Sequence, residues 1–101
     1  MAEVRRSLQA EEDLEIILED LNERGQALAE RFATAFEEKS QLLAQFPEMG
    51  RPRPEIATNL RSTLVHPYVL FYRLEGEVVQ IIRILHGKRD LRSIMEAEPE
   101  G

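Results

Sequence analysis

The stretch that decides the fold is residues 60–91, which read LRSTLVHPYVLFYRLEGEVVQIIRILHGKRDL. Within it, residues 60–65, 68–74 and 78–86 are rich in β-branched and aromatic side chains, which predicts three strands. The pair Glu75-Gly76 suits a two-residue hairpin turn between the last two of them. The stretch therefore predicts an antiparallel sheet in the second half of the chain.

The expected hairpin has two apolar faces. If Leu74 pairs with Glu77 across the turn, opposite residues share a face of the sheet. One face then carries Val69, Phe71, Val78, Ile82 and Ile84, and the other carries Tyr68, Leu70, Tyr72, Val79, Ile81 and Leu85. Both faces are apolar enough to need a cover. We expect helices on one face, while the other is either a groove for a partner segment or is closed by a short helix at residues 91–95.

Two amphipathic helices are predicted upstream of these strands. The first begins after Ser7, whose hydroxyl can cap free backbone N–H groups, and ends at Gly25, which we expect in the left-handed conformation. The second ends before Pro47. Because the turn between them is short, the helices must lie antiparallel and pack on the sheet. Their apolar stripes are Ala10, Leu14, Ile17, Leu18 and Leu21 in the first helix, and Leu28, Ala29, Phe32, Ala33, Phe36 and Leu43 in the second.

The remaining segments complete an α+β fold class. Residues 2–6 can form a short edge strand, and residues 46–54, which hold three prolines and one glycine, form an ordered or mobile connector. We expect a short N-terminal strand, an antiparallel helical hairpin packed on a three- to four-stranded antiparallel sheet, and a short C-terminal helix. Residues 1–95 should form a single domain, and residues 96–101 a disordered acidic tail.

The composition restricts the possible chemistry. The chain has 101 residues, no cysteine and a net charge of −6. Without cysteine there can be no disulfides or thiolate sites, and His66 and His86 lack the spacing of metal ligands, so we expect no metal and no cofactor. No apolar run is long enough to cross a bilayer and the first residues lack a secretory signal, so we expect a cytoplasmic protein with no membrane contact.

The charge is unevenly distributed along the chain. Residues 1–46 carry a net charge of −6, residues 47–95 carry +3, and residues 96–101 carry −3. Affinity for nucleic acid rises with the number of phosphates that a protein neutralises, so an acidic chain with a modestly basic sheet is a poor binder. We therefore expect no direct nucleic-acid binding and a protein as the partner.

Five short motifs follow one another along the chain. They are Ser7-Leu8-Gln9-Ala10 with Asp13-Leu14, Phe46-Pro47 with Gly50, Leu60-Arg61-Ser62, Tyr68-x-x-x-Tyr72-Arg73, and Leu85-His86-Gly87-x-Arg89-Asp90-Leu91. In this order and spacing they resemble the ParE members of the RelE/ParE superfamily of bacterial toxin-antitoxin toxins. The resemblance covers nearly the whole chain and implies the order of elements given above. The superfamily contains ribosome-dependent RNA-cleaving enzymes as well as proteins that poison DNA gyrase.

The residues at the catalytic positions of the RNA-cleaving branch favour the gyrase-binding branch. That branch of nucleases has two lysines, an arginine and a late tyrosine where this chain has Ala57, Asn59, Val69 and Met95, and only Arg89 matches. Breaking a phosphodiester requires a proton acceptor, a proton donor and cations around the phosphorane. We therefore expect no catalytic residues and, by resemblance, a toxin that inhibits growth by binding DNA gyrase.

Two alternatives remain open. The first is a ribosome-dependent mRNA endoribonuclease that uses Arg61, Arg83, His86 and Arg89, and site-specific cuts in messages would indicate it. The second is a degenerate, non-toxic member of the superfamily that only binds its antitoxin. Growth arrest on expression without the antitoxin would exclude this second alternative.

The resemblance also implies a partner, a cognate ParD-like antitoxin in a heterotetramer or larger hetero-oligomer. The residues expected to contact it are Leu14, Leu18, Phe36, Tyr68 and Tyr72, and the candidates for binding the target are Arg61, Arg73, Arg83, His86, Lys88 and Arg89. Simpler interpretations exist, because strand arginines often pair with surface glutamates, and a histidine or tyrosine on a strand is often structural. The positions of Lys88 and Arg89 in the family motif favour a binding surface for these two residues.

Overall fold

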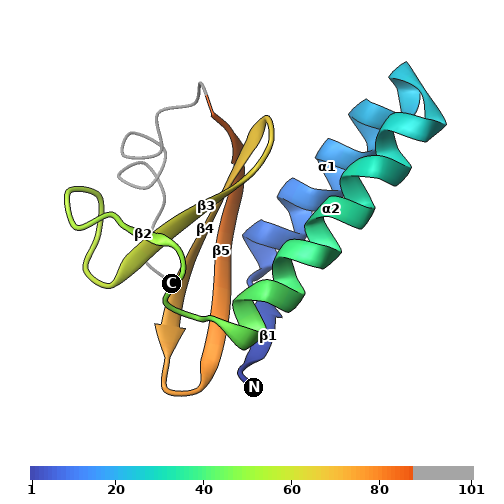
Figure 1. Ribbon diagram of the computed structural model, residues 1–101. Helices are drawn as coiled ribbons and strands as arrows, with labels where there is room; N and C mark the ends of the chain where they lie inside the picture. Colours follow the sequence, from blue (N-terminus) through green and yellow to red (C-terminus); the bar gives the residue numbers. More distant parts are fainter. Residues whose placement is uncertain (88–101) are drawn as a thin grey trace.

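The computed structural model describes residues 1–87, so the helix expected at 91–95 and the tail at 96–101 lie outside the described residues. Two helices lie on one side of a twisted sheet (Figure 1). The elements in chain order are β1 (Glu3–Arg6), α1 (Leu8–Arg24), α2 (Gln26–Gln45), β2 (Arg51–Pro52), β3 (Leu60–Val65), β4 (Tyr68–Glu75) and β5 (Val78–His86). The α+β class and the order of its main elements are as expected from the sequence.

The sheet differs from the expected antiparallel sheet in two ways. In the described part of the chain it has five strands in the order β1-β5-β4-β3-β2, and β1 pairs with β5 in parallel. The parallel pairing arises because the helical hairpin returns the chain to the end of the sheet where β1 begins. The strands of the second half start from there, and β5 runs in the same direction as β1. In the proline-rich connector, Arg51 and Pro52 pair with Ser62 and Arg61 and form the two-residue strand β2.

The β4–β5 hairpin turns one residue later than expected. Glu75 pairs with Val78 and Leu74 pairs with Val79, so the turn consists of Gly76 and Glu77. Gly76 has φ +61°, which glycine adopts without the steric cost that other residues meet. The predicted pairing of Leu74 with Glu77 is therefore wrong.

A bulge in β5 changes which face its last residues occupy. Tyr72 pairs with Ile81, but the next residue, Phe71, pairs with Arg83, so Ile82 has no residue opposite it. One extra residue reverses the alternation of faces beyond the bulge. Ile84 therefore lies on the helix-covered face and Leu85 on the opposite face, the reverse of the expectation.

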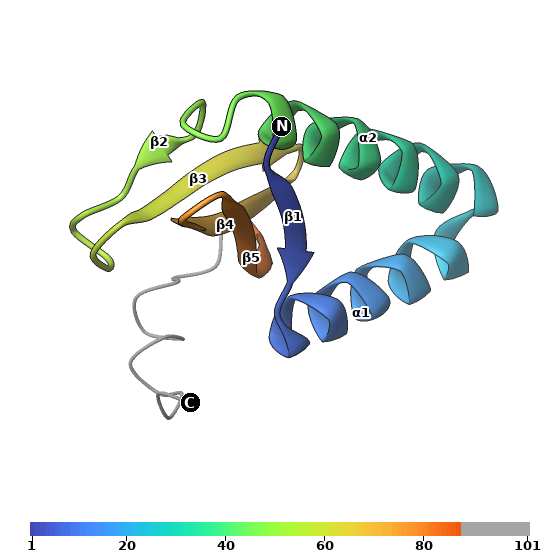
Figure 2. The same cartoon turned by 90° about the horizontal axis from the view of Figure 1, so that it is seen from below.

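The helical hairpin covers one face of the sheet and forms the main core with it. Its buried members include Ile17, Phe32, Phe36 and Leu43 from the helices, and Tyr68, Leu70, Tyr72, Val79, Ile81 and Ile84 from the sheet. Gly25 joins the helices with φ 161°, an extended conformation, so the left-handed cap expected there is wrong. From below, β1 spans the gap between the start of α1 and the end of α2 (Figure 2).

A smaller apolar cluster lies on the other face of the sheet. Leu60, Phe71 and Leu85 are buried there, and Ile56 and Ala57 from the connector before β3 pack against them. Within the part of the chain that the structure describes, this connector therefore covers a portion of the second face.

Candidate functional site

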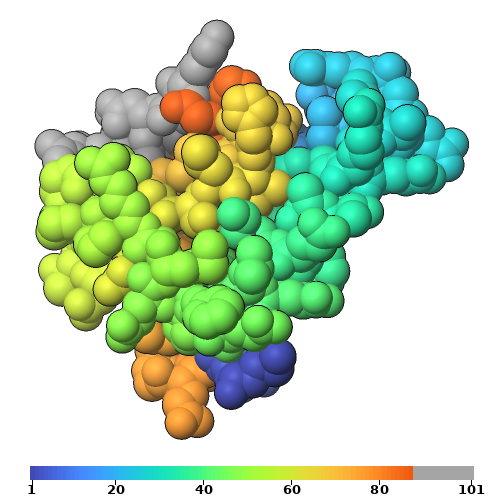
Figure 3. All heavy atoms as spheres, viewed as in Figure 1, coloured from blue at the N-terminus to red at the C-terminus, as the bar shows by residue number. Residues whose placement is uncertain are grey.

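A cleft lies between α1 and the end of the sheet where β5 finishes. Its volume is about 530 Å³. In Figure 3 the end of the helical hairpin, in cyan, stands away from the body of the molecule on this side. The cleft is lined by Asp13, Ile16, Ile17, Asp20, Leu21 and Arg24 of α1, by Pro67 and Tyr68, and by Arg83, Ile84, Leu85 and His86 of β5. It therefore combines an apolar floor with charged residues of both signs.

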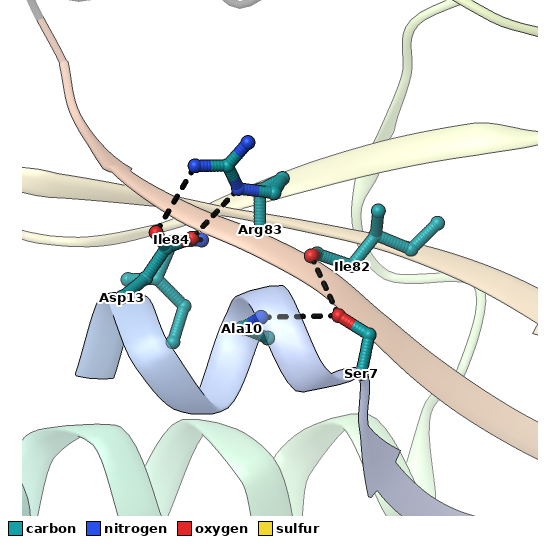
Figure 4. A network of polar contacts seen from close by, with 6 residues as sticks. All are labelled: Ser7, Ala10, Asp13, Ile82, Arg83 and Ile84. Carbon is teal, nitrogen blue, oxygen red and sulfur yellow. Dashed lines mark hydrogen bonds and ion pairs between the residues drawn. The ribbon is translucent and has the colours of Figure 1, made fainter. Parts of the chain in front are cut away.

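An ion pair between α1 and β5 forms one side of the cleft (Figure 4). Arg83 Nε lies 2.8 Å from Asp13 Oδ2, and Arg83 Nη2 lies 3.1 Å from Asp13 Oδ1. The backbone N–H of Ile84 also donates to Asp13 Oδ2, at 3.0 Å. Both charged side chains are only slightly exposed, at 11% and 13%. Such a two-pronged, largely buried pair fixes geometry better than a surface pair does.

This ion pair replaces strand pairing at the edge of β5. Because β1 ends at Arg6, it leaves the last residues of β5 without a neighbouring strand on the edge opposite β4. The Ser7 N–H donates to Ile81 O at 2.9 Å, and the Ser7 hydroxyl donates to Ile82 O while accepting from Ala10 N. The Asp13 carboxylate then accepts a hydrogen bond from the N–H of Ile84. Side chains at the start of α1 thus satisfy backbone groups of β5 that β1 does not reach.

Tyr68 and His86 form the opposite side of the cleft. Their rings meet edge to face, with centroids 5.6 Å apart, and Tyr68 also meets Phe32 of α2 edge to face at 5.2 Å. Tyr68 is buried, whereas His86 is exposed. His86 therefore presents its imidazole ring at the rim of the cleft, packed against the core residue Tyr68.

The cleft brings together three of the predicted site residues, Tyr68, Arg83 and His86, and it adds residues that sequence reasoning missed. Ile16 is the clearest of these, since it is 64% exposed on the cleft side of α1. Its stripe on α1 runs from Asp13 through Asp20 to Arg24 with helical spacing. That stripe lies beside the predicted core stripe. Because it mixes apolar and charged residues, its sequence pattern did not mark it as a binding face.

The other residues expected to contact the antitoxin lie elsewhere. Leu14 and Leu18 are half-buried and pack against the main core. Phe36 and Tyr72 are inside it, with exposed fractions of 3% and 0%. A partner that binds the folded chain therefore cannot touch Phe36 or Tyr72 without rearranging the core.

Tyr72 and Arg61 hold the turn after α2. The Tyr72 hydroxyl donates to Pro47 O at 2.8 Å and accepts from Gly50 N at 2.9 Å. Arg61 Nη1 donates to the carbonyl oxygens of Glu48 and Gly50, at 2.9 and 2.8 Å. Burial raises the pKa of Tyr72, although the Gly50 hydrogen bond acts in the opposite direction. Arg61 thus has a structural role here, and it lies outside the cleft.

The remaining target-binding candidates are not part of the cleft as described. Arg73 is half-buried on β4, opposite Leu60 of β3 and Gln80 of β5. Lys88 and Arg89 lie outside the described residues. Among residues 1–87, no group of three or more His, Asp or Glu side chains could hold a metal ion, and no helix is long and apolar enough to span a membrane.

Comparisons with known proteins agree on one family. Residues 4–91 match the family described as "ParE toxin of type II toxin-antitoxin system, parDE". Among curated proteins of Caulobacter vibrioides, the chain is 35% identical to Toxin ParE3, covering 90% of this chain and 92% of that protein. It is 33% identical to Toxin RelE2 over 88% of this chain and 99% of the relative, and 31% identical to Toxin ParE1 over 92% and 97%.

A solved structure has the same fold. It is titled "Chromosomal ParDE TA system from P. aeruginosa", and it superimposes with a TM-score of 0.70 at 24% identity. The match covers 85% of this chain and 96% of the other.

Proposed function

The chain belongs to the ParE family of toxins from type II toxin-antitoxin systems, and on this premise we propose that it inhibits growth by binding DNA gyrase in the cytoplasm. We further propose that a cognate ParD-like antitoxin neutralises it within a heterotetramer or larger assembly. The proposed action is adhesion to another protein rather than bond cleavage, and it requires neither metal nor cofactor.

The engagement of Arg53, Arg61 and Arg83 is the observation that supports a non-catalytic action most directly. Arg83 is paired with Asp13, and Arg61 is bonded to two backbone carbonyls. Arg53 bonds Glu55 and Ser62. Stabilising a phosphorane requires cations free to turn toward a substrate. Releasing Arg61 or Arg83 would break contacts that hold the turn after α2 and the start of α1.

The positions that carry lysine or arginine in the RNA-cleaving branch hold residues with local structural roles here. Ala57 and Val69 are half-buried against the smaller apolar cluster. Asn59 adopts φ +61°, a conformation that asparagine tolerates in turns. These residues serve local structure, and none of them can move a proton.

The α1–sheet cleft is the proposed place for an antitoxin segment. Its exposed apolar residue Ile16 lies on the side of α1 that also brings Ile17 and Leu21 to the cleft, so a partner helix can bury Ile16 against them. The two charges nearest the floor, Asp13 and Arg83, already neutralise each other. Apolar burial should therefore dominate the affinity, and charges on the rim should affect mainly the association rate.

The decisive test is a supercoiling assay with purified gyrase. We expect the chain to inhibit supercoiling and stabilise cleaved DNA, and the proposed antitoxin to reverse both effects. Replacing Lys88 and Arg89 together by alanine should weaken inhibition by about tenfold or more, as expected for loss of charged contact residues worth roughly 1.4 kcal/mol. Arg31→Ala is the matched control, because it removes an exposed positive charge from α2.

Two results would overturn the proposal. One is unimpaired gyrase activity at toxin concentrations that stop growth. The other is site-specific cutting of messages in translating ribosomes that disappears on Arg89→Ala, which would identify an endoribonuclease instead.

A further inference from the structure

Arg73 is a half-buried arginine on β4, the middle strand of the sheet, and within residues 1–87 it has no hydrogen bond or ion pair. Even Glu75, two positions along the same strand, does not pair with it. Among the described residues, no buried side-chain nitrogen lacks a partner, so the guanidinium nitrogens of Arg73 are in contact with solvent. An arginine placed in this way keeps its charge available for an anion from outside the described residues.

Arg73 lies on the face of the sheet opposite the helices, which we call the open face. Side chains alternate between the two faces along a strand. Tyr72 belongs to the main core under the helices, and Phe71 belongs to the smaller cluster on the other side. Arg73 therefore shares the open face with Phe71.

Two further arginines lie in the same row across the open face. The Arg53 N–H donates to Leu60 O at 2.8 Å, which places Arg53 beside Leu60, the residue opposite Arg73. On the other side, Gln80 pairs with both Arg73 and Arg5. Paired residues share a face, so Arg53, Arg73 and Arg5 form an arginine row. Adjacent strands are ~4.8 Å apart, so successive arginines of this row are ~10 Å apart at their Cα atoms.

The glutamates of the open face leave part of its positive charge unpaired. Arg53 pairs with Glu55 at 2.7 Å, and Arg5 pairs with Glu3 at 2.6 Å. Both glutamates are exposed, and exposed pairs are weak enough to exchange partners. Arg51 of β2 lies on the same face and, like Arg73, forms no ion pair within the described residues. The open face can therefore accept further carboxylates.

Three glutamates near the end of the sequence have a spacing that suits the arginine row. Residues 96–101 read EAEPEG and carry −3, which balances the +3 of residues 47–95. The glutamates Glu96, Glu98 and Glu100 occupy alternate positions. In an extended chain, alternate side chains point to the same side and lie ~7 Å apart. The long arginine side chains can bridge the difference between this spacing and their own.

The chain leaves the sheet close enough for this tail to reach the arginine row. A Cβ on Gly87 would lie 3.8 Å from Cγ2 of Val69, which packs on the open face, so the chain leaves β5 beside that face. Arg73 lies four positions beyond Val69 along β4, or ~13 Å away. Glu96 follows Gly87 by nine positions, which span up to ~30 Å when extended. The connecting residues are therefore long enough.

We propose that the acidic tail, residues 96–101, folds back onto the open face and pairs its glutamates with the arginine row. The docked tail covers arginines that an acidic segment of another protein would otherwise contact, so it acts as a competitor built into the chain. The inference concerns two parts of one chain and does not depend on the proposed action on gyrase.

The strength of the contacts sets how often the tail is docked. Exposed ion pairs are individually weak, so the docked tail exchanges with an undocked one. The connecting residues nevertheless hold the glutamates at an effective concentration of about 1 mM near the row. A free acidic peptide must exceed this concentration to displace the tail.

Paramagnetic relaxation measured by NMR on the full ¹⁵N-labelled chain tests the inference. Because the chain has no cysteine, Gly101→Cys provides a single position for a nitroxide label. At ~0.1 M salt the amide signals of Arg73 and Gln80 should weaken about twofold, and at ~1 M salt they should recover, because the Debye length falls from ~10 to ~3 Å. The same label after reduction gives the reference intensities. The assay contains no gyrase and no antitoxin, so its failure is distinguishable from failure of the proposed function.

Neutral variants test whether charge directs the tail. Replacing Glu96, Glu98 and Glu100 together by glutamine should restore the signals of the open face. The matched control replaces Glu12, Glu15 and Glu19 by glutamine, because these exposed residues of α1 carry the same charge away from the open face.

A second variant tests the arginine row itself. Arg73→Gln should also restore the signals, whereas Arg31→Gln, which removes an exposed charge from α2, should not. The glutamine variant of the tail keeps the test valid if Arg73→Gln does not fold.

Four outcomes would overturn the inference. The signals of Arg73 and Gln80 could stay unchanged at low salt. They could weaken equally with the glutamine tail, which would exclude pairing by charge. The loss could be confined to the end of β5 around His86, in which case the tail pairs near Lys88 and Arg89. The loss could also appear when a spin-labelled chain without ¹⁵N is mixed with an unlabelled ¹⁵N chain, which would show that the tail binds a second copy.

Discussion

The contact between Tyr72 and Gly50 shows how much a single atom matters to this fold. The Tyr72 hydroxyl reaches from the buried sheet to the turn after α2 and bonds at both ends of it. This approach is possible only because residue 50 has no Cβ, which would lie 2.5 Å from the hydroxyl oxygen and 2.7 Å from the ring. Here glycine is needed for space rather than for backbone freedom.

Gly50→Ala should therefore lower the free energy of unfolding by about 1–3 kcal/mol, the range for forcing an extra carbon into a packed site. Urea denaturation followed by circular dichroism would measure the change. Gly25→Ala is the control, because its Cβ would meet only Leu28, at 3.9 Å, and its φ of 161° suits any residue. A Gly50 variant as stable as the Gly25 variant would contradict the argument.

The raised pKa of Tyr72 predicts a loss of stability in alkali. Below about pH 10 this tyrosine is protonated in both the folded and the unfolded chain, so it adds no pH dependence. Above that, the unfolded chain ionises first, because burial keeps the folded hydroxyl protonated, and the free energy of unfolding falls as pH rises. Tyr72→Phe should be less stable by about 1–3 kcal/mol at neutral pH, since it loses two hydrogen bonds. Urea titrations at about pH 8 and about pH 11 should show a smaller alkaline loss for Tyr72→Phe than for the unsubstituted chain, and equal losses would refute this account.

At the scale of elements, the start of α1 works as an extension of the sheet. Ser7 caps its own helix and also bonds β5, and Asp13, nearly two helical turns further on, bonds the same edge of β5. The contact between Asp13 and Arg83 joins residues about seventy positions apart in sequence. It therefore fixes the angle between α1 and β5, on which the shape of the cleft depends.

Asp13→Ala should destabilise the fold by about 3 kcal/mol, because it leaves a largely buried arginine and a backbone N–H without their acceptor. Thermal and urea unfolding would measure the loss. Asp20→Ala removes the same charge from the same helix, but its partner Arg24 is exposed, so this control should change stability by less than about 1 kcal/mol. If the two variants are equally stable, the Asp13–Arg83 pair does not anchor α1.

At the scale of the whole molecule, the helical hairpin and the sheet have different electrostatic characters and meet at the cleft. The first 46 residues carry −6 and residues 47–95 carry +3. The end of the hairpin extends past the sheet (Figure 3), and on the cleft side of α1 Ile16 is 64% exposed. This arrangement suits a partner that wraps around the toxin.

Ile16→Glu should weaken antitoxin binding by about thirtyfold, or roughly 2 kcal/mol, if Ile16 is a central apolar anchor. Raising the salt concentration should change the affinity much less, because screening acts on exposed charges and not on apolar burial. Calorimetry with the antitoxin would measure both. Leu8→Glu is the control, since Leu8 is 81% exposed at the start of the same helix and does not line the cleft. Equal weakening by both variants, or strong salt dependence, would contradict the role of the cleft.

The sequence by itself determined the local elements. Helical spacing and the Ser7 cap predicted α1, Pro47 predicted the end of α2, and β-branched residues predicted the three long strands. The motifs also indicated the family, and the comparisons confirmed it. Helices, strands and motifs depend on residues that are close together in the chain. The pattern within one short stretch of sequence is therefore enough to predict them.

Only the tertiary structure decided the features that join distant residues. The bulge at Ile82 exchanged the faces of Ile84 and Leu85, and β1 completed the sheet in parallel beside β5. Asp13 pairs with Arg83 and the turn after α2 engages Arg61, contacts that no pattern in the sequence indicated. The physical reason is that an arginine or a strand edge bonds whichever acceptor or strand the fold brings near, and that partner is set by three-dimensional packing and not by position in the sequence.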